Sequence, residues 1–196
     1  LNEYWQYAVV FAVLCVIAAV VFYFAGKSRM KYVSNYKQQE NELKRLKALK
    51  DKYHPLTAEK LSQGDGEEIL EAVSLVYQIA FEKSEYPEAE FKKLSDVQKN
   101  IYTLDVFVAD KTATEFFTLN DDMLRCRLYS ALEMIGFDTG METFRTLCDM
   151  YDENNENVSL DKNKLISADE LIEKEDILRK IKLGAAEYIK SNFELL

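Results

Sequence analysis

The chain has 196 residues, of which 48% are hydrophobic and 30% charged, and it contains only two prolines and six glycines. This length suits one domain of ordinary size plus a short additional element, and the composition excludes a disordered chain. Because helix formers such as Leu, Glu, Lys and Ala dominate and turn formers are sparse, we expect an all-α fold.

The net charge of −9 is divided unevenly along the chain. Residues 1–54 carry nine Lys/Arg and four Asp/Glu, a net of +5, whereas residues 55–196 carry 16 and 30, a net of −14. An acidic domain repels nucleic acid and anionic lipid and attracts basic surfaces. We therefore expect no direct nucleic-acid binding and an unidentified protein partner, for which a basic surface is one option.

The first element is an uncharged run of 23 residues from Tyr4 to Gly26. A helix of that length spans about 35 Å, enough for a hydrocarbon core of about 30 Å. Aromatic residues, which favour the headgroup boundary, stand at both ends of the run: Tyr4, Trp5, Tyr7, Phe22, Tyr23 and Phe24. This pattern predicts a single transmembrane anchor over residues 1–26.

Two other interpretations of this run fit less well. A secretory signal has basic residues before a shorter apolar core and a small-residue cleavage site after it, whereas here the basic residues follow and "FYF" occupies the cleavage position. A buried core helix would not need such length. Lys27, Arg29 and Lys31 then lie at the lipid headgroups. Because cytoplasmic flanks carry the excess of Lys/Arg, we expect a single-pass cell-membrane protein with its C-terminal domain in the cytoplasm.

Residues 27–54 form a basic juxtamembrane stem, predicted to be helical until Pro55 ends it. An apolar stripe of Tyr32, Tyr36, Leu43, Leu46 and Tyr53 is interrupted where a heptad seam would need apolar side chains. Three roles remain open for the stem: a short coiled coil that makes a homo-oligomer, a surface against anionic lipid, or a solvated spacer.

Residues 55–196 are predicted to form an acidic bundle of five or six helices. Thr57 caps a short turn, and a helix follows over residues 67–85. Residues 84–94 make a loop or brief turn around Pro87, and the next helix begins at Ser95. A short piece with Phe116 and Phe117 precedes a single helix over residues 123–137, with Gly136 in left-handed conformation at its end. Another helix covers residues 141–151. Ser167 and Glu170 read as the capping box of one last helix over residues 168–193.

Catalytic chemistry is not visible in the sequence. His54 is the only histidine and has no nucleophile near it, so we interpret it as a linker residue. The stretch from Asp152 resembles a calcium loop, but Asn157 and Asn163 replace the required Gly and bidentate Glu. Cys15, Cys126 and Cys148 lack metal-ligand spacing and suit free, buried thiols; a disulfide between the last two remains open. We therefore expect no catalytic, cofactor or metal site and no enzymatic activity.

The segment Leu94–Tyr151 resembles the DNA-mimic-protein-like family of small acidic all-helical bacterial domains. The residues that carry the resemblance are Leu94, Gln98, Val106, Phe116, Phe117, Ala131, Leu132, Ile135 and Gly136. The resemblance implies an acidic helical bundle and, in one branch of the family, a surface that imitates DNA. Duplex DNA carries about one charge per 1.7 Å, a spacing that ordered carboxylates could copy.

These observations favour a membrane-anchored cytoplasmic module that binds another protein and has no catalytic site. The alternative is a DNA-mimic or immunity-type inhibitor whose acidic face blocks a basic, nucleic-acid-binding protein.

Overall fold

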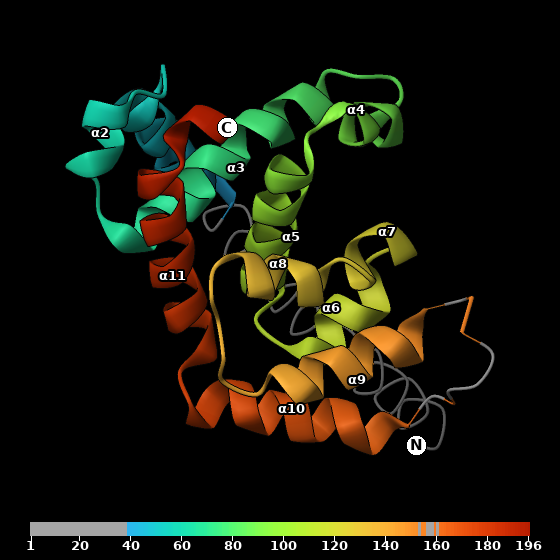
Figure 1. Cartoon of the computed structure of the whole chain (residues 1–196). Coiled ribbons are helices and arrows are strands. Elements are labelled where there is room, and N and C mark those ends of the chain that lie inside the picture. Colours follow the sequence, from blue (N-terminus) through green and yellow to red (C-terminus); the bar gives the residue numbers. More distant parts are fainter. Residues whose placement is uncertain (1–38, 153, 156–158, 160) are drawn as a thin grey trace, which may run out of the picture. The chain divides into compact units, whose positions relative to one another are not determined.

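The computed structural model describes residues 39–152, 154–155, 159 and 161–196. Within these residues every regular element is a helix (Figure 1), so the predicted all-α class is confirmed. Contacts divide the chain into two compact units, Leu1–Ala48 and Leu49–Leu196. The predicted span and headgroup residues, Tyr4, Trp5, Tyr7, Phe22, Tyr23, Phe24, Lys27, Arg29 and Lys31, lie outside the described residues. Among the helices described, none combines the length and the apolar character that a membrane crossing requires.

Residues 39–48, the described part of the first unit, are helical. Lys44 pairs with Glu40 at 2.6 Å and Arg45 with Glu42 at 2.7 Å, each about one turn along the helix. Such exposed pairs support a helix in water but contribute little each. The three roles considered for the stem stay predictions.

The second unit begins at Leu49, and its residues 49–53 are helical. Leu49 and Tyr53 are buried, which ties this short segment upstream of Pro55 to the unit. Its described residues then contain ten α-helices and a final 3-10 turn, η1 (Phe193–Leu195). The helices are α2 (Ala58–Ser62), α3 (Gly66–Glu82), α4 (Pro87–Lys93), α5 (Asp96–Asp110), α6 (Ala113–Leu119), α7 (Asp122–Arg125), α8 (Leu128–Met134), α9 (Met141–Tyr151), α10 (Lys162–Lys174) and α11 (Ile177–Ser191). The predicted count of five or six was too low for the described residues, because two predicted helices are divided and two segments predicted as turns contain the short helices α2 and α4.

Local capping explains where most of these helices begin. An Asp, Ser or Thr side chain accepts a backbone N–H of the first turn in six of the helices described: Thr57, Asp65, Ser95, Thr112, Asp121 and Asp161. α5 begins after Ser95, as predicted, and Ser95 and Gln98 form a full capping box there. Pro87 occupies the first turn of α4, where its missing N–H is not needed, so the predicted loop or turn contains a seven-residue helix.

The predicted helix over residues 123–137 is divided into α7 and α8 by a turn at Cys126 and Arg127. The Arg127 guanidinium lies 3.2 Å from both Asp96 and Asn100 of α5, which holds the turn against that helix. Gly136 follows α8 with φ of 67°, the left-handed conformation that was predicted.

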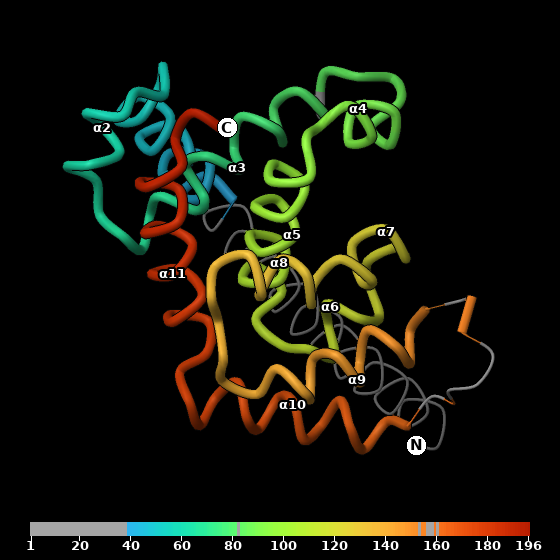
Figure 2. Tube along the Cα trace, viewed as in Figure 1, coloured from blue at the N-terminus to red at the C-terminus, as the bar shows by residue number. Residues whose placement is uncertain are grey.

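The prediction for the last helix was wrong at both its start and its middle. α10 begins at Lys162 with Asp161 as its cap, so Ser167 lies inside the helix and forms no capping box. Burial of Leu165 explains the earlier start, because it brings that turn into the core. A corner at Asp176 then separates α10 from α11 (Figure 2). Ile172 and Ile177 are both buried, yet five residues place side chains about 140° apart on a straight helix.

The core of the second unit is aromatic. The rings of Phe107, Phe116 and Phe144 are fully buried and meet edge to face, with centroids 5.2 and 5.6 Å apart. Such pairs add about 0.5–1.5 kcal/mol each beyond their buried area. Around this core α11 packs along α3, and α5 packs against α3 and α8. This framework positions α4 and α7, which carry the candidate site.

Candidate functional site

A small aromatic pocket lies where α3, α4, α5 and α7 approach one another. Phe81, Phe91 and Tyr102 form its wall, with ring centroids 5.1–6.3 Å apart and tilted or edge-on geometry. Each ring comes from a different helix, so the three hold one another in place. Met123 and Leu124 of α7 complete the apolar lining of a pocket of about 130 Å³.

Two carboxylates, Glu88 of α4 and Asp121 before α7, also line this pocket. Their position places negative charge beside the aromatic wall. Burial raises the pKa of Tyr102, and the charges of Asp105 and Asp121 raise it further, so its hydroxyl stays protonated in neutral solution. The pocket therefore offers an apolar interior and an anionic border.

Two further hollows share lining residues with this pocket. One shares Pro87 and Glu88 and extends along α4, and the other shares Met123 and extends beyond α7. We call the three together the α4–α7 surface. Five carboxylates and two cations line it: Glu85, Glu88, Asp121, Asp122, Asp152, Lys92 and Arg127. Arg127 already pairs with Asp96, which leaves the surface strongly anionic.

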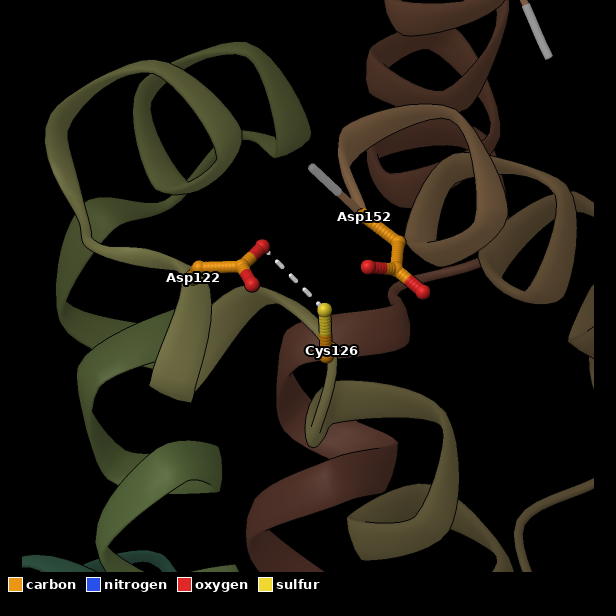
Figure 3. A group of neighbouring side chains, drawn as sticks. All are labelled: Asp122, Cys126 and Asp152. Atoms are coloured by element: carbon orange, nitrogen blue, oxygen red, sulfur yellow. Dashed lines mark hydrogen bonds between the residues drawn. The ribbon is translucent and has the colours of Figure 1, made fainter. Parts of the chain in front are cut away.

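One cluster on this surface joins Asp122 and Cys126 of the α7 region with Asp152 after α9 (Figure 3). A carboxylate oxygen of each Asp and the Cys126 sulfur all lie within 4.8 Å of one another. The Cys126 thiol donates a hydrogen bond of 3.2 Å to Asp122. Desolvation raises the pKa of this thiol to about 12, and the Asp122 hydrogen bond and negative charge act in the same direction. The cluster is thus a protonated thiol between two carboxylates.

Cys15 lies outside the described residues. Of the two cysteines described, one differs from the prediction. Cys148 is buried and free, as expected, but Cys126 is exposed, because it lies at the turn between α7 and α8 rather than inside a longer helix. The Cys148 sulfur lies 3.2 Å from the carbonyl oxygen of Arg125 and donates to it. Burial raises the pKa of Cys148 to about 12.

His54, the histidine considered in the sequence, lies apart from the α4–α7 surface. His54 is half-buried, and its carbonyl oxygen accepts a 2.8 Å hydrogen bond from Lys60. Asp121, by contrast, caps α7 and also lines the aromatic pocket. Phe81, Phe91 and Tyr102 lie on three consecutive helices. Their contact depends on how those helices pack, which periodicity along the sequence does not indicate.

No family model matches the chain, and neither the curated proteins nor the solved structures include a match to it. The resemblance of Leu94–Tyr151 to the DNA-mimic-protein-like family therefore stays a prediction.

Proposed function

We propose that this chain is a single-pass membrane-anchored protein whose cytoplasmic acidic domain binds another protein through the α4–α7 surface. The observation that carries the proposal is the aromatic pocket bordered by Glu88 and Asp121. The proposal assigns the domain no reaction of its own. The apolar run of residues 4–26 supports the anchor, and Lys27, Arg29 and Lys31 support the orientation.

The size of the pocket favours a protein ligand. A volume of about 130 Å³ accommodates one large side chain rather than a whole metabolite. Protein interfaces concentrate their binding energy in such anchors, each inserted into a desolvated pocket. Because the three rings already pack against one another, the pocket needs little reorganisation when a partner arrives.

The charges of the α4–α7 surface favour a basic partner. Its five carboxylates outnumber its two cations, and one of these cations, Arg127, is engaged by Asp96. A surface of one sign accelerates association with an oppositely charged partner and disfavours anionic ones.

The grouping of five carboxylates also supports a second candidate, a DNA-mimic or immunity-type inhibitor that blocks a nucleic-acid-binding protein. The two candidates differ in salt dependence. A DNA-binding face meets its target through many ion pairs. A mimic should therefore lose its partner by about 0.5 M salt, where charges interact over only a few Å. An interface centred on an apolar anchor should survive that salt concentration.

Site-specific photo-crosslinking of the full chain in cells tests the binding proposal. A photoreactive phenylalanine replaces Tyr86, which is 71% exposed on the α4–α7 surface, or Leu195, which is 52% exposed outside it. We expect an adduct of defined mass at position 86, and no such adduct at position 195. Met123→Lys, which places a cation in the aromatic pocket, should abolish the adduct while the helical circular dichroism is retained.

The same adduct at both positions, or its persistence in Met123→Lys, would contradict the α4–α7 surface as the binding site. The anchor and its orientation have separate tests. The chain should stay in the membrane pellet after alkaline carbonate, and external protease should leave the C-terminal domain intact in sealed cells. Removal of that domain without lysis would show that the orientation is wrong.

A further inference from the structure

A second, larger groove lies along α10, between the turn that joins α5 to α6 and the corner that joins α10 to α11. It has a volume of about 560 Å³. None of its lining residues belongs to the α4–α7 surface. We call it the α10 groove; its apolar side chains are Ile166, Ile172 and Leu178.

The charges of α10 are segregated with respect to this groove. The helix carries three lysines and three acidic residues. Its acidic residues, Asp169, Glu170 and Glu173, all line the groove, whereas its lysines, Lys162, Lys164 and Lys174, do not. Asp176 adds a fourth carboxylate, and Lys111 is the one cation among the lining residues that the structure describes. The groove is therefore anionic although its main helix is neutral.

One apolar side chain of the groove is open to solvent. Ile166 is 56% exposed, which is unusual for an isoleucine that has apolar neighbours in a hollow. From Ile166 to Glu173 the groove follows α10 for about 10 Å, or two helical turns. This length suits the anchors of an amphipathic helix, which recur at three- and four-residue spacing.

The backbone adopts a left-handed conformation at each end of the groove. Among the described residues, Lys111 and Asp176 are the non-glycine residues with positive φ, at 66° and 50°. Both line the groove. The Asp169 carboxylate is fixed, because it accepts hydrogen bonds from the Thr114 hydroxyl at 2.6 Å and from the Thr114 N–H at 3.1 Å. Glu170, Glu173 and Asp176 then remain to meet a ligand.

We propose that the α10 groove binds a basic amphipathic helix of a partner protein. Aliphatic side chains of that helix pack on Ile166 and Leu178, and its flanking Lys or Arg side chains pair with Glu170, Glu173 and Asp176. The charge complementarity of the groove selects this partner over an acidic or purely apolar one. The proposal does not depend on the α4–α7 surface, because the two sites share no lining residue.

The probe is a synthetic peptide of about 14 residues, four helical turns, composed of Leu, Ala and Lys with leucines at three- and four-residue spacing. A scrambled peptide of the same composition serves as its control. The full chain is used in neutral detergent, and empty micelles provide the blank. Fluorescence anisotropy measures affinity, and hydrogen exchange locates the peptide. We expect protection of residues 111–112 and 166–178, without protection of α4 or α7.

Matched variants test the two parts of the groove. The double variant Glu170→Gln/Glu173→Gln should weaken binding about tenfold, and Ile166→Ser about fivefold, while the exchange pattern without peptide is unchanged. The control Glu187→Gln/Glu194→Gln removes two exposed carboxylates outside the groove, and Leu195→Ser removes an exposed leucine outside it. Both controls should stay within about twofold of the wild-type affinity.

Three results would overturn the proposal: equal binding of the scrambled peptide, equal losses in the groove and control variants, or protection confined to other helices. Other occupants give distinct signatures before any peptide is added. Protection of residues 166–178 that disappears on dilution would show a second copy of the chain in the groove. Protection at every dilution that is lost when residues 1–38 are deleted would show that the chain fills its own groove. Either result contradicts a partner helix.

Discussion

The buried hydroxyl of Tyr53 donates a 3.0 Å hydrogen bond to Glu68, near the start of α3, and accepts a 3.1 Å bond from the N–H of Asp65. Tyr53 is 1% exposed. A residue at the end of the helical segment 49–53 is thereby fixed to the cap of the first long helix of the acidic domain. Lys52 reaches the same Glu68 oxygen at 2.6 Å from the exposed side.

Tyr53→Phe should lower the free energy of unfolding by about 1–2 kcal/mol, because the Asp65 N–H then loses its buried acceptor. Urea unfolding of the full chain, followed by circular dichroism, measures the change. Lys52→Gln is the matched control: it removes an exposed ion pair to the same Glu68 and should change stability little. Equal effects of the two variants would contradict a special role for the buried hydroxyl.

Two glycines with positive φ make a matched pair of variants. Gly136 and Gly140 have φ of 67° and 72°. An added Cβ would meet nothing within 4 Å at Gly136, but would approach the Leu171 side chain to 2.5 Å at Gly140. Gly136→Ala should therefore cost about 1 kcal/mol for the left-handed backbone, and Gly140→Ala about 1 kcal/mol more.

Denaturant midpoints of the two alanine variants compare these costs directly. If both glycine variants lose the same stability, the Leu171 side chain moves aside freely, and the close approach between α10 and the start of α9 has no energetic consequence.

Alkaline pH should destabilise the acidic domain through Tyr77. Burial raises the pKa of Tyr77 to about 12, whereas an unfolded tyrosine releases its proton near pH 10. The contribution of the protonated Tyr77 hydroxyl to the free energy of unfolding is therefore fully present below about pH 10. It is lost as the pH rises towards about 12, because the unfolded state then binds fewer protons than the folded state. Tyr77→Phe should flatten this part of the stability profile.

Urea midpoints measured between about pH 9 and 12 test the Tyr77 prediction. Tyr86→Phe, at a tyrosine that is 71% exposed, controls for the loss of a hydroxyl. An unchanged slope in Tyr77→Phe would show that another group causes the alkaline loss. Cys148 is the first alternative, since burial also raises its pKa to about 12.

The exposed thiol of Cys126 should react slowly with iodoacetamide near pH 8, because its raised pKa leaves little thiolate. Asp122→Asn removes the negative charge of the carboxylate that accepts the thiol's hydrogen bond, which lowers the pKa of Cys126 and should accelerate alkylation several-fold. Peptide mass spectrometry follows Cys126 separately from Cys15 and Cys148. Asp138→Asn, an exposed carboxylate outside the cluster, should leave the rate unchanged. Acceleration by both variants would indicate a general charge effect instead.

Much of the local structure could be predicted because its causes are local. The start of α5 follows from Ser95 and Gln98, and the end of α8 from Gly136, since capping and left-handed turns involve residues within one helical turn. Phe116 and Phe117 are fully buried, as large apolar side chains most often are. The charge division between residues 1–54 and 55–196 is likewise a property of composition.

The helix breaks at Cys126–Arg127 and at Asp176 could not be derived in this way. Local sequence favours helix on both sides of each break, but Arg127 is drawn to Asp96 and Asn100, and Ile172 and Ile177 are buried from different directions. The candidate sites likewise depend on contacts between residues of different helices. The aromatic pocket joins Phe81, Phe91 and Tyr102 from three helices, and the α10 groove joins Lys111 to α10. Composition and periodicity thus establish an acidic helical protein with an apolar N-terminal run, whereas long-range packing places carboxylates beside apolar hollows.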